Sequence, residues 1–246
     1  YDYANHKIRF LCPLTSNSHY NITNLQKWDG RTLLCTSRWS HALLVDMPTG
    51  RTRPVPFESN EIIASLIDKN GHIWVAPYHQ GVKCYDRQGK LLHSYHTGNS
   101  LLQTNVVLSL TENNGQIWIG TDGAGIYILN PENDEISTIA HAPGNPYSLP
   151  VNSILYLYSD SNNNMWAGSV RGGLINIREV GMKIYSDALP GTEYGLSEKA
   201  VLSIYQGEEK DIWIGTDGGG INRFYPDENR FYHTKSTWGD KISSIT

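Results

Sequence analysis

The sequence has few charged residues and no excess of positive charge. Asp, Glu, Lys and Arg make up 18% of its 246 residues, against roughly 25% in a typical globular domain, and the formal net charge is −4. A surface that binds DNA or RNA needs Lys and Arg in excess, so the composition argues against nucleic-acid binding.

Other features are missing as well. Three Cys, an odd number, exclude a fully paired disulfide framework. No apolar run reaches the ~18 residues that a bilayer-spanning helix requires. Residues 1–6 (YDYANH) show no basic patch followed by an apolar stretch, so we do not expect a signal peptide there. We expect the chain to be a piece of a longer protein.

Glycine and two of the aromatic residues are plentiful instead. The chain has 23 Gly, 15 Tyr and 7 Trp but only 4 Phe, and its apolar share is 39%. This composition favours many short strands joined by tight turns over helices, and it is too apolar for a disordered chain.

An internal repeat organises the sequence. Residues 115–126 (GQIWIGTDGAGI) match residues 211–221 (DIWIGTDGGGI), and weaker copies lie at 71–82 and 164–174. The Trp residues of the four copies are 44, 48 and 47 positions apart, and a degraded fifth copy lies at 30–36. In the four clear copies a small residue stands two positions after the Trp and a Gly seven positions after it.

Each repeat contains four strand-like runs separated by turn residues. In the last repeat these runs are 201–205, 212–216, 221–225 and 230–234. Four antiparallel strands in each period of ~45 residues are typical of a β-propeller blade. We therefore predict an all-β propeller segment with five blades at about 20–57, 61–96, 105–140, 151–186 and 200–235.

Part-blades are expected at both ends of the chain. A last strand at 7–10, within residues 1–12, and a first strand at 242–245, within residues 240–246, cannot supply the four strands of a complete sixth blade. We therefore expect an arc of a larger ring, for example one of seven blades.

The alternation of side chains along a strand gives the Trp and the small residue one shared face. We expect the Trp to fill the wide outer gap between neighbouring blades and the small residue to lie where the blades converge. The Gly before the third strand is expected to adopt a positive φ.

The same residues carry a family resemblance. Residues 201–226 (VLSIYQGEEKDIWIGTDGGGINRFYP) and 108–131 resemble the two-component-regulator propeller repeat, and the linker 141–150 (HAPGNPYSLP) is similar to the connection between blades in that family. The resemblance extends over nearly the whole chain, and it weakens towards the first repeat.

The resemblance implies a periplasmic sensor. Such repeats form the sensor part of hybrid two-component proteins that control transcription by phosphorelay in polysaccharide-foraging bacteria. It further implies an oligosaccharide ligand, neighbouring propeller and β-sandwich domains, a membrane-anchored parent with a histidine kinase, and self-association as a homodimer. No cofactor is implied.

An enzymatic propeller is the main alternative, in the form of a lyase or glycosidase acting on sugars. The sialidase Asp box is absent, because Asp68 lies one residue too early before Gly71 and Trp74. A sialidase also needs three converging arginines, whereas Arg171 alone lies in a suitable turn. The sequence has no nucleophile elbow, P-loop or HExxH motif. We therefore expect no catalytic residue in this segment.

No group of residues has the spacing of a metal site. His93 and His96 point to opposite faces of a predicted strand, and the acidic turn 208–211 is expected to be solvated. Asp122 and Asp217 form a tempting carboxylate pair, but a whole blade separates them and Asp-Gly suits a tight turn. Three cysteines on different predicted strands are expected as small buried hydrophobes, with a disulfide as the alternative: Cys12, Cys35 and Cys84.

A ligand is expected where the turns between second and third strands meet the connections between blades. Two of these turns keep Asp-Gly-rich sequences, whereas three carry aromatic and hydrogen-bonding residues. Flat rings can stack on sugars, and Arg, His or Gln can bind hydroxyl groups or a uronate. We predict a ligand or partner face with these residues: Trp39, His41, Tyr78, His79, Tyr147, Arg171 and Tyr194. A structural, protein-binding propeller is the third hypothesis.

Overall fold

The computed structural model describes residues 22–58, 60–143, 148–178, 181–186, 195–234 and 242. In this part of the chain there are twenty strands and no helix. The chain divides into two compact units, residues 1–96 and 97–246, which are described separately.

The first unit contains two four-stranded antiparallel sheets, blades 1 and 2. The strands of blade 1 are β1 (Ile22–Lys27), β2 (Thr32–Ser37), β3 (Leu43–Asp46) and β4 (Thr52–Pro54). Those of blade 2 are β5 (Ile62–Ile67), β6 (Ile73–Pro77), β7 (Val82–Tyr85) and β8 (Leu91–Tyr95).

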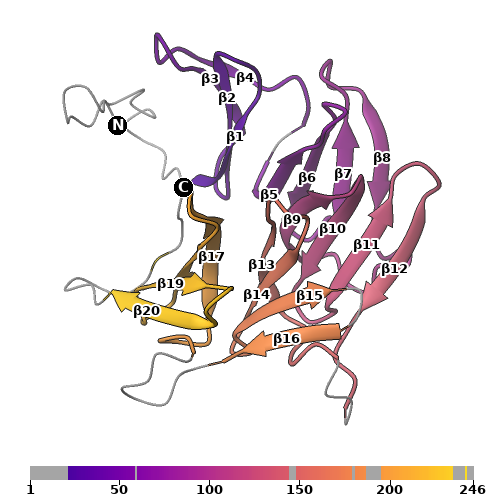
Figure 1. The fold of residues 1–246 in the computed structure, drawn as a ribbon. Coiled ribbons are helices and arrows are strands. Elements are labelled where there is room, and N and C mark those ends of the chain that lie inside the picture. The colour runs from indigo at the N-terminus through magenta and orange to yellow at the C-terminus, as the bar shows by residue number, and fades with distance from the viewer. Residues whose placement is uncertain are drawn as a thin grey trace. The chain divides into compact units, whose positions relative to one another are not determined.

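The second unit contains three sheets of the same kind, blades 3 to 5 (Figure 1). Blade 3 has β9 (Val107–Asn113), β10 (Gln116–Thr121), β11 (Ile126–Asn130) and β12 (Glu135–Ile139). Blade 4 has β13 (Ile154–Ser159), β14 (Met165–Ser169), β15 (Leu174–Arg178) and β16 (Gly181–Tyr185). Blade 5 has β17 (Val201–Gln206), β18 (Ile212–Thr216), β19 (Ile221–Tyr225) and β20 (Arg230–Thr234).

All five sheets pair their strands in chain order, as expected for propeller blades. The predicted all-β class and the five four-stranded blades are therefore confirmed. Of the expected part-blades, the strand at 7–10 lies outside the described residues and only Ile242 of 242–245 lies within them. The helix-free described part offers no apolar helix that could span a membrane.

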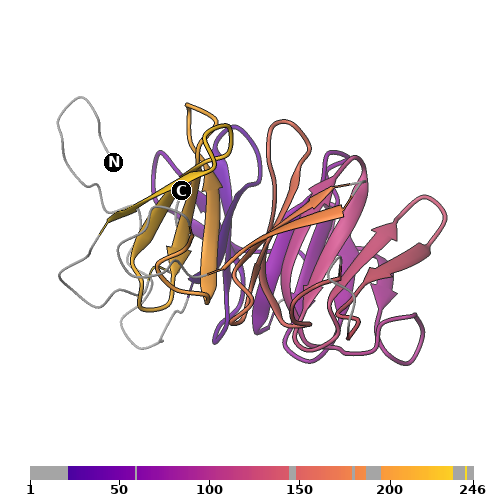
Figure 2. The same ribbon diagram turned by 60° about the horizontal axis from the view of Figure 1, so that its bottom comes forward.

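Small residues bring neighbouring blades of the second unit together. The strand β13 contacts β9 and β10, and β17 contacts β13 and β14 (Figures 1 and 2). A Cβ added to Gly168 would lie 2.5 Å from Cγ1 of Val201, the first residue of the next blade. A Cβ on Gly120 would lie 3.1 Å from Ile154, which has the same position in blade 4. The expected convergence of blades at this position is confirmed in this unit.

The Trp on the same face as the small residue lies between blades, as expected. Trp166 is 2% exposed and contacts Phe224 of blade 5, with ring centroids 6.1 Å apart. Trp118 packs with Ile154 and Leu157 of blade 4. Trp213 differs, since it is only half-buried and the Arg223 guanidinium lies 5.0 Å from its ring centre.

An aspartate at the end of the first strand ties two of these Trp residues to the adjacent turn. Asp160 Oδ1 accepts hydrogen bonds from the backbone N–H groups of Asn162 and Asn164, while Oδ2 accepts the indole N–H of Trp166 at 3.0 Å. Asp68 makes the same bonds to its own turn and to Trp74, at 2.9 Å to the indole nitrogen. A single carboxylate thus accepts from two backbone donors of its turn and satisfies the buried indole N–H of the Trp.

The two blades of the first unit join through apolar and polar contacts. Leu34 and Leu44 of blade 1 share a core with Ile62, Ile73 and other residues of blade 2. The side-chain amides of Asn24 and Gln26 both donate to the backbone carbonyl of Ser65, at 3.0 and 2.6 Å. This double contact fixes the first strand of blade 1 against the first strand of blade 2.

Glycine precedes the third strand because the backbone there has a positive φ and no space. The φ values are 74°, 80°, 79° and 74° at Gly81, Gly125, Gly173 and Gly220. A Cβ on Gly173 would lie 2.0 Å from the carbonyl oxygen of Tyr185 in the fourth strand. The expected left-handed conformation is confirmed.

Adding one methyl group at the blade interface is expected to destabilise the second unit. We predict that Gly168→Ala lowers the free energy of unfolding by about 1–3 kcal/mol, because the new Cβ collides with Val201 and the blades must move apart. Gly30→Ala is the matched control, since an added Cβ there has no atom within 4 Å. Equal denaturation midpoints of the two variants would contradict this account.

The two described cysteines, Cys35 and Cys84, are buried and no disulfide joins them to each other, in agreement with the small-hydrophobe interpretation. Burial raises the pKa of the Cys84 thiol to about 12, and the charge of Asp68 adds to the shift. Because the thiolate is the nucleophile, Cys84 is a neutral, unreactive thiol at pH 8.

We therefore predict that a Cys12→Ser variant shows no fast-reacting thiol towards Ellman's reagent at pH 8. The two buried thiols, Cys35 and Cys84, are expected to react after unfolding in guanidinium chloride. Rapid reaction of the folded variant would show that the blades open to reagent.

Candidate functional site

The turn between the second and third strands and the start of the first strand lie together at one end of each blade. In blade 2 the backbone N–H of Tyr78 donates to the carbonyl of Glu61 at 2.9 Å. The equivalent bond joins Val170 to Ser153 in blade 4 and Asp217 to Ala200 in blade 5. We call these turns the b–c loops, and their end of the blade the loop end.

All five b–c loops have the same length. The paired residues that flank each loop, such as Cys35 with Leu43 or Ala167 with Ile175, are equally far apart in the sequence. The loops therefore differ in side chains rather than in their attachment to the sheet.

Aromatic and basic side chains gather on the b–c loops of the first unit. Trp39 is 61% exposed and Tyr78 is 42% exposed. The guanidinium of Arg38 lies 5.2 Å from the ring centre of Trp39 and 5.7 Å from that of Tyr78, so it links the two loops. His79 contacts Tyr78 edge-on, with ring centroids 4.0 Å apart.

A hollow of about 510 Å³ opens beside this group. Six residues line it: Trp39, Ser40, His41, Asn60, Glu61 and Gln80. The lining combines one aromatic face with hydroxyl, imidazole, amide and carboxylate groups. Such a surface can stack a sugar ring and hydrogen-bond its hydroxyl groups, and its volume falls within the range of small-molecule sites.

Two of the predicted site residues occupy strained backbone positions. His79 has φ 56° and Arg171 has φ 62°, whereas glycine stands at the same loop position in blades 3 and 5, with φ 88° at Gly123 and 102° at Gly218. A side chain in the left-handed region is unfavourable by about 1–2 kcal/mol. The two loops thus retain His and Arg where glycine would fit without strain, and such outliers cluster at functional sites.

The structure brings four of the seven predicted residues together. Trp39, His41, Tyr78 and His79 lie on adjacent loops of the first unit, and all are exposed. Arg171 is exposed on a b–c loop of the second unit. Tyr147 and Tyr194 lie outside the described residues.

Sequence reasoning missed five residues of this group, namely Arg38, Ser40, Asn60, Glu61 and Gln80. Arg38 and Gln80 lie within the selected loops, and a cation beside two aromatic residues was a usable signal. Asn60 and Glu61 precede β5 in a connection between blades, which was expected at this end, but neither residue was selected from the sequence.

The described residues do not form a metal centre at the loop end. No group of three or more His, Cys, Asp and Glu residues within them could hold a metal ion. Asp122 accepts a hydrogen bond from Ser153 Oγ of the next blade, 2.7 Å away, so its carboxylate supports the junction between blades 3 and 4.

Three segments of the second unit match the family described as two component regulator propeller. The matched residues are 100–123, 148–171 and 195–218, each of which contains the first two strands of a blade. These segments are two-component regulator propeller repeats, as the resemblance of the sequence implied. A search of curated protein sequences finds no match.

Solved structures show the same fold at low sequence identity. The extracellular domain assigned to the hybrid two component system BT3049 of B. thetaiotaomicron is 20% identical, with a TM-score of 0.61 over 89% of this chain and 34% of that chain. A second extracellular domain from that organism, BT4673, is 18% identical, with a TM-score of 0.50 over 86% of this chain and 35% of that chain.

A third similar structure comes from outside two-component systems. The WD40 repeats of RRP9 are 11% identical, with a TM-score of 0.66 over 89% of this chain and 65% of that chain. The likeness therefore shows the propeller fold alone. The chain spans about a third of the length of the two extracellular domains, which agrees with the expected arc of a larger propeller assembly.

Glycine at the strained loop position is expected to stabilise the protein. We predict that Arg171→Gly raises the free energy of unfolding by about 0.5–1 kcal/mol, because relief of the left-handed strain exceeds the entropy that glycine adds to the unfolded chain. Gly123→Ala is the reciprocal control, since it introduces a Cβ at φ 88° with no atom within 4 Å and should destabilise. Denaturant titration measures both changes. A less stable Arg171→Gly variant would show that the side chain holds the loop in place.

Proposed function

We propose that this chain, which carries two-component regulator propeller repeats, is part of the extracytoplasmic ligand sensor of a hybrid two-component protein. The observation that carries the proposal is the match of blades 3, 4 and 5 to that repeat family. The fold shared with the extracellular domain of BT3049 supports a periplasmic or extracellular position. The parent protein is then a membrane-anchored histidine kinase that controls transcription by phosphorelay.

The proposed ligand is an oligosaccharide released from a glycan. Trp39 and Tyr78 expose flat apolar faces, and the hollow beside them offers hydroxyl, amide and imidazole groups. Sugar rings need this combination, because their C–H faces pack on aromatic rings while their hydroxyl groups require hydrogen-bond partners. Arg38 is held over both rings and keeps guanidinium N–H donors for a polar or acidic substituent.

Binding without catalysis suits this surface better than an enzyme does. Glycoside hydrolysis requires two carboxyl groups on either side of the bond that breaks. Among the six residues that line the hollow, Glu61 alone carries a carboxylate. We therefore propose that the segment transmits occupancy to further propeller and β-sandwich domains of a homodimeric parent.

A protein-binding propeller is the second candidate function. It is favoured by the exposure of Trp39 and Tyr78, since aromatic residues and Arg are also enriched at protein interfaces. The two candidates differ in the size of the partner and in the response to free sugars.

The proposed sugar site is tested by truncating its aromatic platform. We predict that Trp39→Ala weakens oligosaccharide binding by the full-length sensor at least about tenfold, which corresponds to about 1.4 kcal/mol. A panel of neutral and acidic oligosaccharides, tested by isothermal titration calorimetry, supplies the probes. Tyr232→Ala, which removes a 45% exposed ring from blade 5, is the matched control.

The outcomes separate the hypotheses. Loss of affinity in Trp39→Ala alone, with an unchanged melting temperature, supports the sugar site. Unchanged affinity in Trp39→Ala would reject this surface as the site. Binding of no oligosaccharide, together with capture of a protein partner that Trp39→Ala abolishes, would favour the protein-binding propeller.

A further inference from the structure

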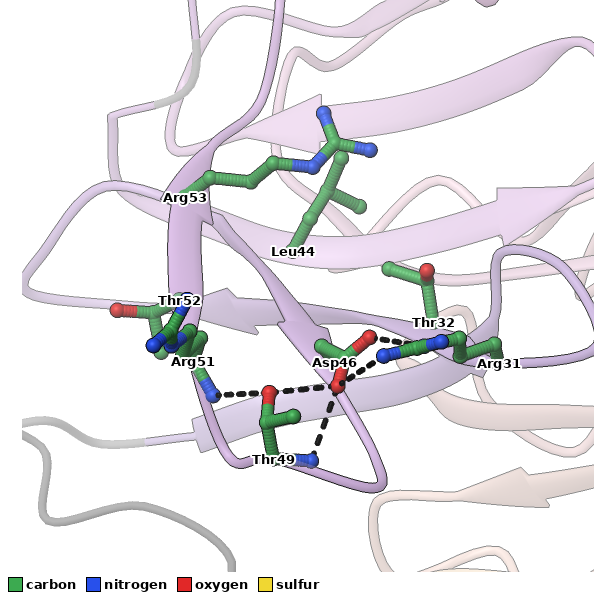
Figure 3. Close-up of a pocket in the computed structure, with 8 residues that line it drawn as sticks. All are labelled: Arg31, Thr32, Leu44, Asp46, Thr49, Arg51, Thr52 and Arg53. Carbon is green, nitrogen blue, oxygen red and sulfur yellow. Dashed lines mark hydrogen bonds and ion pairs between the residues drawn. The ribbon is translucent and has the colours of Figure 1, made fainter.

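A second hollow lies at the end of blade 1 opposite to the b–c loops. Its volume is about 310 Å³, and it opens between the residue before β2 and the turn that joins β3 to β4 (Figure 3). Eight residues line it: Arg31, Thr32, Leu44, Asp46, Thr49, Arg51, Thr52 and Arg53. Three guanidinium groups therefore share this space with one carboxylate.

That carboxylate is fully engaged by its neighbours. The guanidinium of Arg31 forms an ion pair with Asp46, in which Nε contacts Oδ2 and Nη2 lies 3.4 Å from Oδ1. Asp46 Oδ1 also accepts the backbone N–H of Thr49 at 2.9 Å and its hydroxyl at 2.6 Å (Figure 3). The hydrogen bonds from Arg31 and Thr49 hold the pKa of Asp46 below its ordinary value. Asp46 therefore pairs with Arg31, and no ion pair joins it to Arg51 or Arg53 in the described part of the chain.

The other two guanidinium groups have no anionic partner. No hydrogen bond or ion pair engages the guanidinium of Arg51 or Arg53 anywhere in the described ranges of the chain. Arg53 lies in β4 and Arg51 directly precedes that strand, and both residues line the hollow. In Figure 3 Arg53 extends over Leu44, while Arg31 and Arg51 lie on opposite sides of Asp46 and Thr49.

This concentration of charge is unusual for the chain as a whole. The formal net charge of the protein is −4, yet the hollow holds two uncompensated positive charges beside a neutralised pair. Guanidinium groups present forked N–H donors that match the paired oxygens of carboxylate, phosphate and sulfate groups. Thr32 and Thr52 line the same space.

We propose that this hollow is a binding site for an oxyanion, either free or as the acidic group of a larger molecule, held by Arg51 and Arg53. The site is independent of the loop end, because the two hollows share no residue and lie at opposite ends of blade 1. It would give the protein a response to acidic ligands or ions, separate from recognition by the aromatic platform.

The test measures binding of three anions by isothermal titration calorimetry at constant ionic strength, with sodium chloride as the reference salt. Inorganic sulfate and inorganic phosphate represent tetrahedral oxyanions, and glucuronate represents a carboxylate on a sugar. We expect at least one of them to bind, and Arg51→Gln and Arg53→Gln each to weaken that binding about tenfold. Lys90→Gln, which removes one exposed charge from blade 2, is the control and should bind like the original protein.

Circular dichroism and the melting temperature of each variant show whether it is folded, so that a loss of binding can be told from a loss of structure. Should Arg53→Gln prove unstable, Arg53→Lys keeps the charge but loses the fork, and a smaller loss of affinity is expected. Binding of sulfate or phosphate identifies a tetrahedral oxyanion, whereas binding of glucuronate alone identifies a carboxylate. The proposal is overturned if no anion binds more tightly than chloride, or if the Arg51→Gln/Arg53→Gln double variant retains the original affinity.

Discussion

The close approach of neighbouring blades at one small residue is the constraint on which the second unit depends. An added methyl group would collide with Val201 at Gly168 and would be tight against Ile154 at Gly120. Because the blades diverge outward from this point, a large side chain must fill the wider space on the same face, and Trp118 and Trp166 do so. The pairing of a small residue with a Trp in each repeat follows from this wedge-shaped space.

The same constraint positions the b–c loops. The backbone N–H of Gly125 donates to the carbonyl of Asn152, and that of Gly173 donates to the carbonyl of Lys199, just before the first strand of the next blade. The glycine therefore both avoids a collision with the fourth strand and ties its loop to the following blade. Since these bonds use backbone atoms only, the other loop residues are free to vary.

The sequence predicted the sheets accurately because the repeat shows each of them several times. The last three strands of blade 5 have the bounds that turn residues and alternation indicated, and β17 extends one residue further. The bond between Asp160 and Trp166 could not be predicted, because it depends on the conformation of the intervening turn. Blade 3 departs from this pattern although its sequence repeat is clear. The turn between β9 and β10 is shorter than the equivalent turns of blades 2 and 4, and the indole N–H of Trp118 has no hydrogen bond.

The candidate site was predictable to the level of loops but not of side-chain partners. Departure from the Asp-Gly pattern indicated the loops of Trp39, Tyr78 and Arg171, and all three side chains are exposed. The contact of Arg38 with two rings on different loops depends on how blades 1 and 2 pack, which no local pattern encodes. Likewise, the positive φ of Arg171 is a property of the folded loop that the residue type does not indicate.

Loops of equal length between equivalent strand pairs have an evolutionary consequence. When a repeat is duplicated or recombined, the residues of its b–c loop take the same position relative to the second and third strands, and no insertion or deletion is needed. Selection can therefore reshape the chemistry of the exposed end by point substitution alone, while the strands that carry it stay in register. A protein built this way can acquire a new specificity one blade at a time.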